Sequence, residues 1–315
     1  MDARAQDWPA LPLEAWRDTH TTLHLWAQVV GKIRLAQTPW INHCWHVTLY
    51  VTASGLTTGP IPHGARTLQI DFDVLRDALL LRTGDGDAAE VPLAPQSVAT
   101  FHRRVMDALD AFGMPVHIYP VPNEIPDATP FADDRAPRPY DGEYVRRYWR
   151  ILAQSARVFT VFRARFVGKC SPVHFFWGAP DLTLSRFSGR TAPEHPGGIP
   201  NLPDRITREA YSHEVSSCGF WAGGGAIAYP AFYAYAYPSP PGFADAKVAP
   251  AAAFYSKDFG EFILPYDAVR TSGDPDATLL AFLQSTYDAA ADLGRWDRAA
   301  LERPRDFVRP DGRAS

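Results

Sequence analysis

Cysteine is scarce in this chain. Its 315 residues include three cysteines, Cys44, Cys170 and Cys218, which lie far apart and form no Cys-x-x-Cys pair. A disulfide framework or a structural zinc site needs paired or closely spaced cysteines. The sequence therefore argues against both, and we expect a reducing, cytoplasmic setting.

Long apolar runs and an excess of positive charge are also missing. No apolar stretch approaches the roughly 20 residues of a membrane-spanning helix, and the first residues contain no apolar signal core. The formal net charge is −4 and the sequence pI is about 6.2, so no broad positive field is available to neutralise nucleic-acid phosphates. We expect a small-molecule ligand as the partner, with no nucleic acid and no membrane.

Several reaction signatures are absent as well. The sequence has no Gly-x-Gly-x-x-Gly fingerprint, no Walker loop and no Gly-x-Ser-x-Gly elbow. The glycine run at 223–225 is not followed by Lys and Ser or Thr, so it is a weak signal for phosphate binding. His213 precedes Glu214 as in helical zinc proteases, but Ser217 stands where those enzymes have their second histidine. The chemistry has to be inferred from individual residues.

Aromatic residues, in contrast, are abundant at 13% of the chain, and large rings often line small-molecule pockets. Apolar residues three, four and seven positions apart predict helices, over residues 13–35, 97–112, 144–166 and 274–294. Alternating side chains predict strands, over residues 45–53, 67–72, 78–83, 90–93, 116–119, 173–177, 182–187, 213–221, 231–237, 252–255 and 261–264. This order predicts an α+β fold in which helices pack on antiparallel sheets.

The two halves of the chain share short motifs. Val-Gly-Lys at 30–32 recurs at 167–169, and Val-Pro-Leu at 91–93 resembles Ile-Leu-Pro at 263–265. This similarity predicts an internally duplicated helix–antiparallel sheet–helix unit that forms one compact body, the alternative being an accidental likeness within one α+β domain. We divide the chain into four parts: a first half (1–119), a Pro-rich connection (120–141), a second half with long loops and the predicted site (142–302), and a flexible tail (303–315).

Three segments resemble a known family. They read Trp-Pro-Ala-Leu-Pro-Leu at 8–13, Gly-Lys-Cys-Ser-Pro-Val-His-Phe-Phe-Trp-Gly at 168–178 and Tyr-Ser-His-Glu-Val-Ser-Ser-Cys-Gly-Phe-Trp at 211–221. Over nearly its whole length the chain is similar to a family of uncharacterised bacterial proteins, a domain of unknown function. The resemblance implies no reaction and no site residues, because none is assigned to that family.

The polar strand predicted at 213–221 is the first candidate for a site. Successive side chains of a strand point to opposite faces, so Glu214 and Cys218 share one face while His213 and Trp221 share the other. We interpret the first face as facing a pocket, with Glu214 as a catalytic acid or base and Cys218 as a nucleophile or ligand. The alternative is that Cys218 is buried and inert, and that Glu214 pairs with an arginine.

His174, within Pro-Val-His-Phe-Phe-Trp, is the third catalytic candidate. Burial among aromatic rings favours the neutral imidazole, which suits a general base or a metal ligand, although a core histidine has the same surroundings. We expect Phe176, Trp177 and Trp221 to wall the pocket and contact the substrate. Arg186 would bind a carboxylate or phosphate of the substrate, unless it lies on a solvated face.

A metal site is a further hypothesis. His174, His213 and Glu214 would supply two imidazoles and one carboxylate to one divalent first-row metal ion, although no spacing rule supports this set. His43 and His46 in the first half are three residues apart, so on a strand they face opposite sides and form no natural ligand pair.

The leading functional hypothesis is a cytoplasmic enzyme that acts on a small polar or aromatic molecule by acid–base chemistry, assisted by a metal if the metal site forms. The loop at 189–204 would cover its pocket. The alternative is a non-catalytic protein that binds a small ligand in an aromatic pocket. A third hypothesis, an interaction protein, predicts an exposed apolar patch in place of a pocket.

Overall fold

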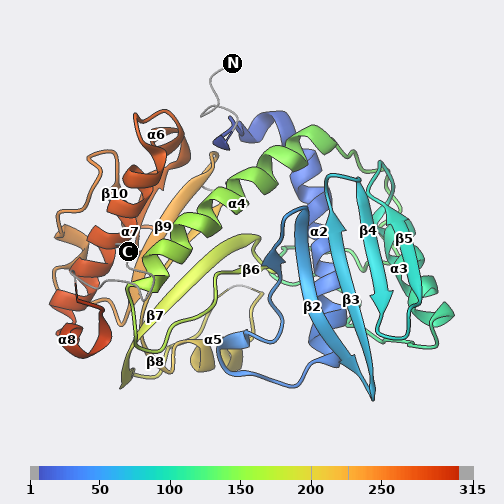
Figure 1. Cartoon of the computed structure of the whole chain (residues 1–315), viewed down its shortest axis with the longest axis horizontal. Coiled ribbons are helices and arrows are strands. Elements are labelled where there is room, and N and C mark those ends of the chain that lie inside the picture. Colours follow the sequence, from blue (N-terminus) through green and yellow to red (C-terminus); the bar gives the residue numbers. More distant parts are fainter. Residues whose placement is uncertain (1–6, 200, 226, 305–315) are drawn as a thin grey trace, which may run out of the picture.

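Two antiparallel sheets lie side by side in the computed structural model, with helices packed against them (Figure 1). The structure describes residues 7–199, 201–225 and 227–304. The fold is α+β in one compact body, as the sequence predicts.

The first sheet comes from the N-terminal half, and its strands are neighbours in chain order. They are β1 (Tyr50–Val51), β2 (Gly55–His63), β3 (Arg66–Asp73), β4 (Ala78–Thr83) and β5 (Ala88–Pro92). The long helix α2 (Leu13–Gln37) packs on β2, and α3 (Val98–Ala111) packs on α2 and β5. Ser97 caps α3 by accepting a hydrogen bond from the backbone N–H of Thr100.

The second sheet has the strand order β10-β11-β9-β8-β7-β6. Its strands are β6 (His174–Phe176), β7 (Asp181–Thr191), β8 (His213–Trp221), β9 (Ala231–Tyr237), β10 (Phe254–Ser256) and β11 (Glu261–Pro265). Helices α4 (Gly142–Ala164) and α7 (Pro275–Leu293) pack against it and against each other. As predicted, α7 begins after an Asp274 cap with proline in its first turn.

Contacts between the two halves fix the place where the site forms. Helix α2 of the first half packs against α4 of the second. Leu49 and Phe175 also exchange two backbone hydrogen bonds of 2.8 Å, so the segment before β1 is tied to β6, the edge strand of the second sheet.

The second sheet has two different faces. Its helix-covered face is mostly apolar, and it carries the buried residues Leu182, Leu184, Cys218, Phe220 and Phe232. Because side chains alternate along a strand, the residues between them point to the opposite side. That second face is polar and aromatic, with Asp181, Thr183, Ser185, Ser217, Tyr233 and Tyr235.

Several elements differ from the prediction. The strand expected at 45–53 is wrong over most of its length, because the 3₁₀ helix η1 (Asn42–Cys44) and a turn precede the two-residue strand β1. The strand expected at 116–119 is irregular backbone. Strand β2 was not predicted because it contains Pro60 and Pro62. Both lie beyond the part of β2 that pairs with β1, where a missing N–H breaks no ladder on that side.

Short helices were also missed: α5 (Asp204–Ala210), α6 (Tyr266–Arg270), α8 (Arg298–Leu301) and the 3₁₀ helix η2 (Phe243–Asp245). The internal duplication remains a prediction, since the two sheets differ in strand number and order. In the described part of the chain, no helix combines the length and the apolar character needed to cross a membrane.

Candidate active site

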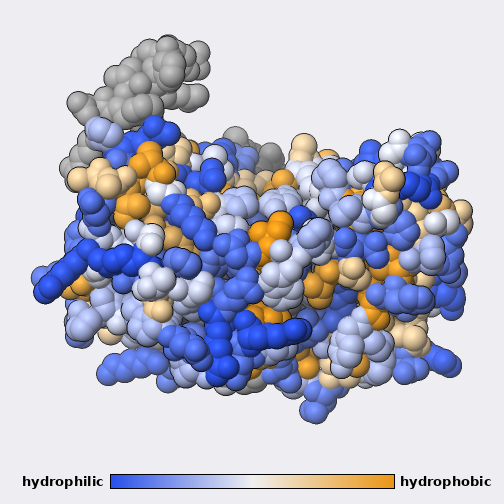
Figure 2. All heavy atoms as spheres, turned by 90° about the horizontal axis from the view of Figure 1, so that it is seen from below, coloured by the Kyte–Doolittle hydropathy of each residue, from blue (hydrophilic) through white to orange (hydrophobic). Residues whose placement is uncertain are grey.

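A cavity of 860 Å³ lies between the two halves, within the range of small-molecule sites. Its floor is the polar face of the second sheet. Its other walls are α2, the segment 40–47, the Pro-rich connection at 119–128, and residues 199 and 201–211 around α5. From below, the molecule is mostly hydrophilic, with small hydrophobic groups near the middle of that face (Figure 2).

Asp181, at the start of β7, is the carboxyl group of the cavity floor. Thr183 donates a 2.6 Å hydrogen bond to its Oδ2, and the hydroxyl of Tyr233 donates to the same oxygen. Tyr233 stands on β9 and reaches Asp181 across β8, where Gly219 leaves the path open. A Cβ atom at Gly219 would lie 2.3 Å from the Tyr233 hydroxyl oxygen.

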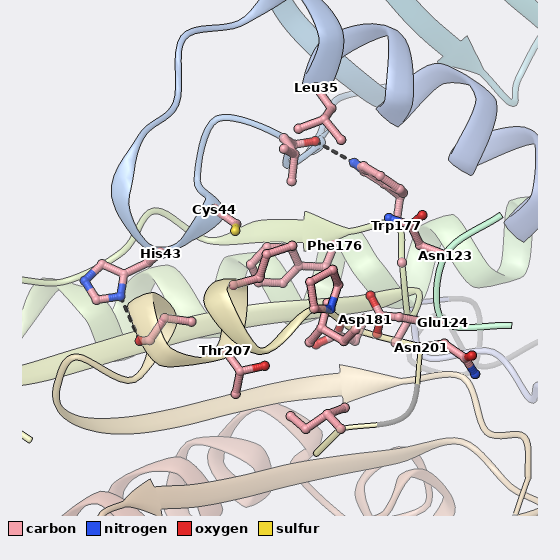
Figure 3. Close-up of a pocket in the computed structure, with 18 of the residues that line it drawn as sticks. Leu35, His43, Cys44, Asn123, Glu124, Phe176, Trp177, Asp181, Asn201 and Thr207 are labelled. Atoms are coloured by element: carbon pink, nitrogen blue, oxygen red, sulfur yellow. Dashed lines mark hydrogen bonds between the residues drawn. The ribbon is translucent and has the colours of Figure 1, made fainter. Parts of the chain in front are cut away.

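A second carboxyl group, that of Glu124, enters the cavity from the Pro-rich connection (Figure 3). Helix α2 holds this connection through a buried polar stripe. The side chain of Gln28 exchanges hydrogen bonds of 2.7 and 2.8 Å with the backbone of Asn123, and Lys32 Nζ donates to Asn123 Oδ1 at 2.7 Å. The residue next to Glu124 is therefore fixed from two sides.

The backbone of Glu124 is strained, and its carboxyl group fills a space that a glycine leaves. Glu124 has φ of 58°, a left-handed conformation that costs a non-glycine residue about 1–2 kcal/mol. A Cβ atom at Gly178 would lie 2.0 Å from Glu124 Oε1. Strain of this kind persists where surrounding contacts enforce it, and it clusters at functional sites.

Both carboxyl groups have a raised pKa. Burial raises the pKa of Asp181 to about 6, against the opposing effect of its hydrogen bonds from Thr183 and Tyr233. Burial, and then the charge of Asp181, raises the pKa of Glu124 to about 7. Among the described residues neither carboxylate has a salt-bridge partner within 4.0 Å. Asp181 and Glu124 therefore form an unpaired acid pair at the cavity.

His174 lies at the cavity floor, and one of its ring nitrogens has no hydrogen-bond partner in the described chain. Its Nδ1 lies 2.7 Å from the carbonyl oxygen of Pro172. A carbonyl oxygen can only accept, so Nδ1 carries the proton and Nε2 is an acceptor. Burial lowers the pKa of His174 to about 4, so the ring is neutral. Nε2 is fully buried and has no hydrogen-bond partner within the described chain.

Two aromatic side chains after His174 complete this wall. Phe176 and Trp177 both line the cavity. The Trp177 indole N–H donates to the carbonyl oxygen of Val47 at 2.7 Å (Figure 3), and its ring lies against α2 at Gly31. A Cβ atom at Gly31 would lie 2.3 Å from three atoms of the indole.

We expect Gly31→Ala to destabilise the protein by about 1–2 kcal/mol. Alanine gains about 1 kcal/mol in helix propensity, but overpacking against Trp177 costs about 1–3 kcal/mol or more at so short a contact. Denaturant unfolding measures the difference, and the penalty should shrink in a Trp177→Phe background, where the smaller ring can give way. A more stable Gly31→Ala variant would contradict the packing of Trp177.

Residues 199 and 201–211, which include α5, form one wall of the cavity and share only residues 199 and 201–204 with the predicted cover at 189–204. Two hydrogen bonds hold α5 to the segment around η1. The Trp40 indole donates to Glu209 Oε2 at 2.7 Å, and His43 Nδ1 lies 2.8 Å from the carbonyl oxygen of Ala210.

The structure separates the predicted catalytic residues. His174 lines the cavity, but Glu214 and Cys218 do not. Glu214 accepts hydrogen bonds from Arg190 at 2.6 Å and Ser188 at 2.8 Å at the end of the sheet. Cys218 is buried in the core, and burial raises its pKa to about 12. The strand alternation was assigned correctly, but the cavity lies on the other face.

The predicted binding residues separate in the same way. Phe176 and Trp177 line the cavity, whereas Trp221 packs beside Ile227 and Ile263. Arg186 lies on the helix-covered face, where its guanidinium group stacks on the ring of Phe162 at 3.4 Å from the centroid.

The predicted metal ligands do not converge. In the described part of the chain no three His, Cys, Asp or Glu side chains are grouped so as to hold a metal ion, so His174, His213 and Glu214 do not form the expected set. His213 lies next to His43, with ring centroids 6.2 Å apart. His43 and His46 both line the cavity.

Asp181 and Glu124 were missed by the sequence interpretation. Glu124 lies in a segment interpreted as a plain connection, and Asp181 was placed one residue before its strand. A usable signal was present in α2, where Gln28 and Lys32 interrupt the apolar side of the helix at i and i+4. Buried polar residues on such a side require partners, and here the partner is the connection that carries Glu124.

Comparisons with known proteins identify a family without an assigned activity. DUF5996, described as a family of unknown function, matches residues 8–303 of the chain. No curated protein and no solved structure matches it.

Proposed function

We propose a function from the cavity itself, since the chain belongs to DUF5996, a family of unknown function. The proposal is an enzyme that moves a proton on a small molecule, with Glu124 as the general acid or base. Asp181 is its partner carboxyl group and His174 a binding group. A cytoplasmic setting belongs to this proposal, in keeping with three free cysteines.

The observation that carries the proposal is the unpaired acid pair at the cavity between the two halves. General acid–base catalysis is most effective when the pKa of the catalytic group lies near the working pH. A pKa of about 7 for Glu124 leaves both protonation states populated near neutral pH. Glu124 can therefore accept a proton from a bound molecule, or return one, without a large energetic penalty.

Surrounding contacts keep the pair in place. The hydroxyl groups of Thr183 and Tyr233 fix Asp181, and the Asn123 contacts of α2 fix the connection beside Glu124. Such preorganisation means that little rearrangement is needed when the charge on the bound molecule changes.

Binding without turnover is the second candidate. The aromatic wall of Phe176 and Trp177 would hold a flat or apolar ligand equally well if no reaction followed. The two candidates differ in one result, which is whether a compound is consumed.

The test is to incubate the protein with a small-molecule cell extract and to follow compounds by mass spectrometry over time. We expect the wild-type protein to consume at least one compound and to form a product. Glu124→Gln should not do so. Glu214→Gln, which removes a carboxylate outside the cavity, should behave like the wild type. Binding of a compound that is never consumed would support the second candidate instead.

A further inference from the structure

Several donors around the acid pair are already engaged within the protein. The hydroxyl groups of Thr183 and Tyr233 already donate to Asp181 Oδ2, and the indole N–H of Trp177 donates to a backbone carbonyl. The hydroxyl of Tyr211 donates to that of Tyr235 at 3.0 Å. These four donors are therefore already used by acceptors of the protein itself.

The acceptors, in contrast, remain open. Glu124 accepts no hydrogen bond from any described residue, and both hydroxyl donors of Asp181 fall on one of its two oxygens. His174 Nε2 is a third acceptor without a partner in the described chain, and it is fully buried. A ligand that donates to Glu124 and Asp181 would supply hydrogen bonds that no described residue gives to their remaining oxygens.

Two cations of the lining, Lys32 and Arg205, could favour the opposite kind of ligand, and Lys32 is the one next to Asn123. Its ammonium group donates to Asn123 Oδ1 and lies 5.1 Å from the ring centroid of Tyr119 and 6.0 Å from that of Trp177. Lys32 is thus engaged in holding the connection. With two carboxyl groups and one ammonium in this part of the lining, the local charge is negative when both acids are ionised.

We infer that the cavity binds an organic cation: a small molecule whose protonated nitrogen lies between Glu124 and Asp181. Its apolar body lies against Phe176 and Trp177, whose rings also attract a nearby cation through their negative faces. This inference concerns the ligand class of the site proposed above and rests on that cavity being the functional one.

An ammonium group also fits the acid–base proposal. A positive charge between two carboxyl groups favours their ionised forms, so it displaces the protons that they hold in the empty protein. Glu124 is then a carboxylate next to the bound molecule, ready to act as a base.

A matched probe series tests the ligand class with the full-length protein. Phenethylamine, 2-phenylethanol and phenylacetate share one aromatic body and differ in carrying a positive, neutral or negative group. We expect phenethylamine to bind at least tenfold more tightly than the other two in calorimetric titration at pH 8. In Glu124→Gln and in Asp181→Asn this preference should fall by at least tenfold. In Glu214→Gln it should be unchanged.

Three outcomes would overturn the inference: tighter binding of the alcohol or the acid, no measurable binding of phenethylamine, or an amine preference that survives in both cavity variants. Melting temperatures of all variants show whether a lost preference reflects unfolding. The two proposals fail separately. An amine preference without any turnover would contradict the proposed enzyme and support the cationic ligand class. Glu124-dependent turnover of a neutral or acidic compound would support the enzyme and contradict the ligand class.

Discussion

Glu124→Gln is expected to lower turnover by a factor of about 10² to 10⁴ and, at the same time, to stabilise the protein above neutral pH. The loss of turnover is the usual contribution of a general acid or base, since glutamine cannot exchange a proton. The gain in stability arises because the wild-type protein has to keep an ionised carboxylate in a buried position, and glutamine has no charge to bury.

The sign of the stability effect follows from the pKa of Glu124 in the two states. It is about 7 in the folded protein, against an ordinary value of 4.5 for glutamate, so the folded state holds its proton more tightly than the unfolded state. Below pH 4.5 both states are protonated and the variant should match the wild type. As the pH rises from about 4.5 through about 7, the wild type loses stability. By pH 8 the variant should be more stable by about 2 kcal/mol, allowing for partial exposure.

Urea unfolding at pH 4.5 and pH 8 measures this difference, and a turnover assay of the same samples measures the catalytic loss. Asp181→Asn is the matched variant, because an asparagine oxygen can still accept from Thr183 and Tyr233. Without the negative charge of Asp181, the pKa of Glu124 should fall, and the pH–rate profile should move toward lower pH. Equal stability of Glu124→Gln and wild type at pH 8 would contradict a raised pKa.

The sequence was informative where local patterns decide the structure. Strand β9 begins and ends at the predicted residues, and α7 begins at the predicted cap and proline. Both depend on short-range signals: alternation of aromatic residues with alanine in one, and N-terminal capping chemistry in the other. Elements that depend on partners distant in sequence were harder to predict, such as β2 with its two prolines and the two-residue strand β1.

The candidate site was less predictable because it is assembled from segments that are distant in sequence. His174, Phe176 and Trp177 were identified from their aromatic surroundings. Glu124 and Asp181 are far apart in the sequence, on opposite sides of α4, and no local pattern connects the two. Alternation along β8 divides its side chains between two faces, but it does not say which face the helices cover. The face that meets the cavity therefore could not be predicted.

Arg186, which was predicted to bind the substrate, is buried among aromatic rings. Its side chain is 2% exposed and has no carboxylate partner within the described chain. The guanidinium group instead lies 3.4 Å from the ring centroid of Phe162 and 4.3 Å from that of Tyr287, and it donates to the carbonyl oxygen of Phe162. This environment indicates a packing role between β7, α4 and α7, away from the cavity.

Arg186→Ala is therefore expected to destabilise the protein by about 3 kcal/mol, because it leaves a hole between aromatic rings and removes the cation–π contacts with Phe162, Phe166 and Tyr287. Arg186→Met fills most of the same volume without a buried charge, so its stability should stay within about 1 kcal/mol of the wild type. Denaturant unfolding separates the two variants, and kcat/KM per folded molecule should be unchanged in both. If Arg186 bound the substrate, as the sequence suggested, Arg186→Met would fold normally and lose substrate affinity, because a thioether cannot pair with a carboxylate or phosphate.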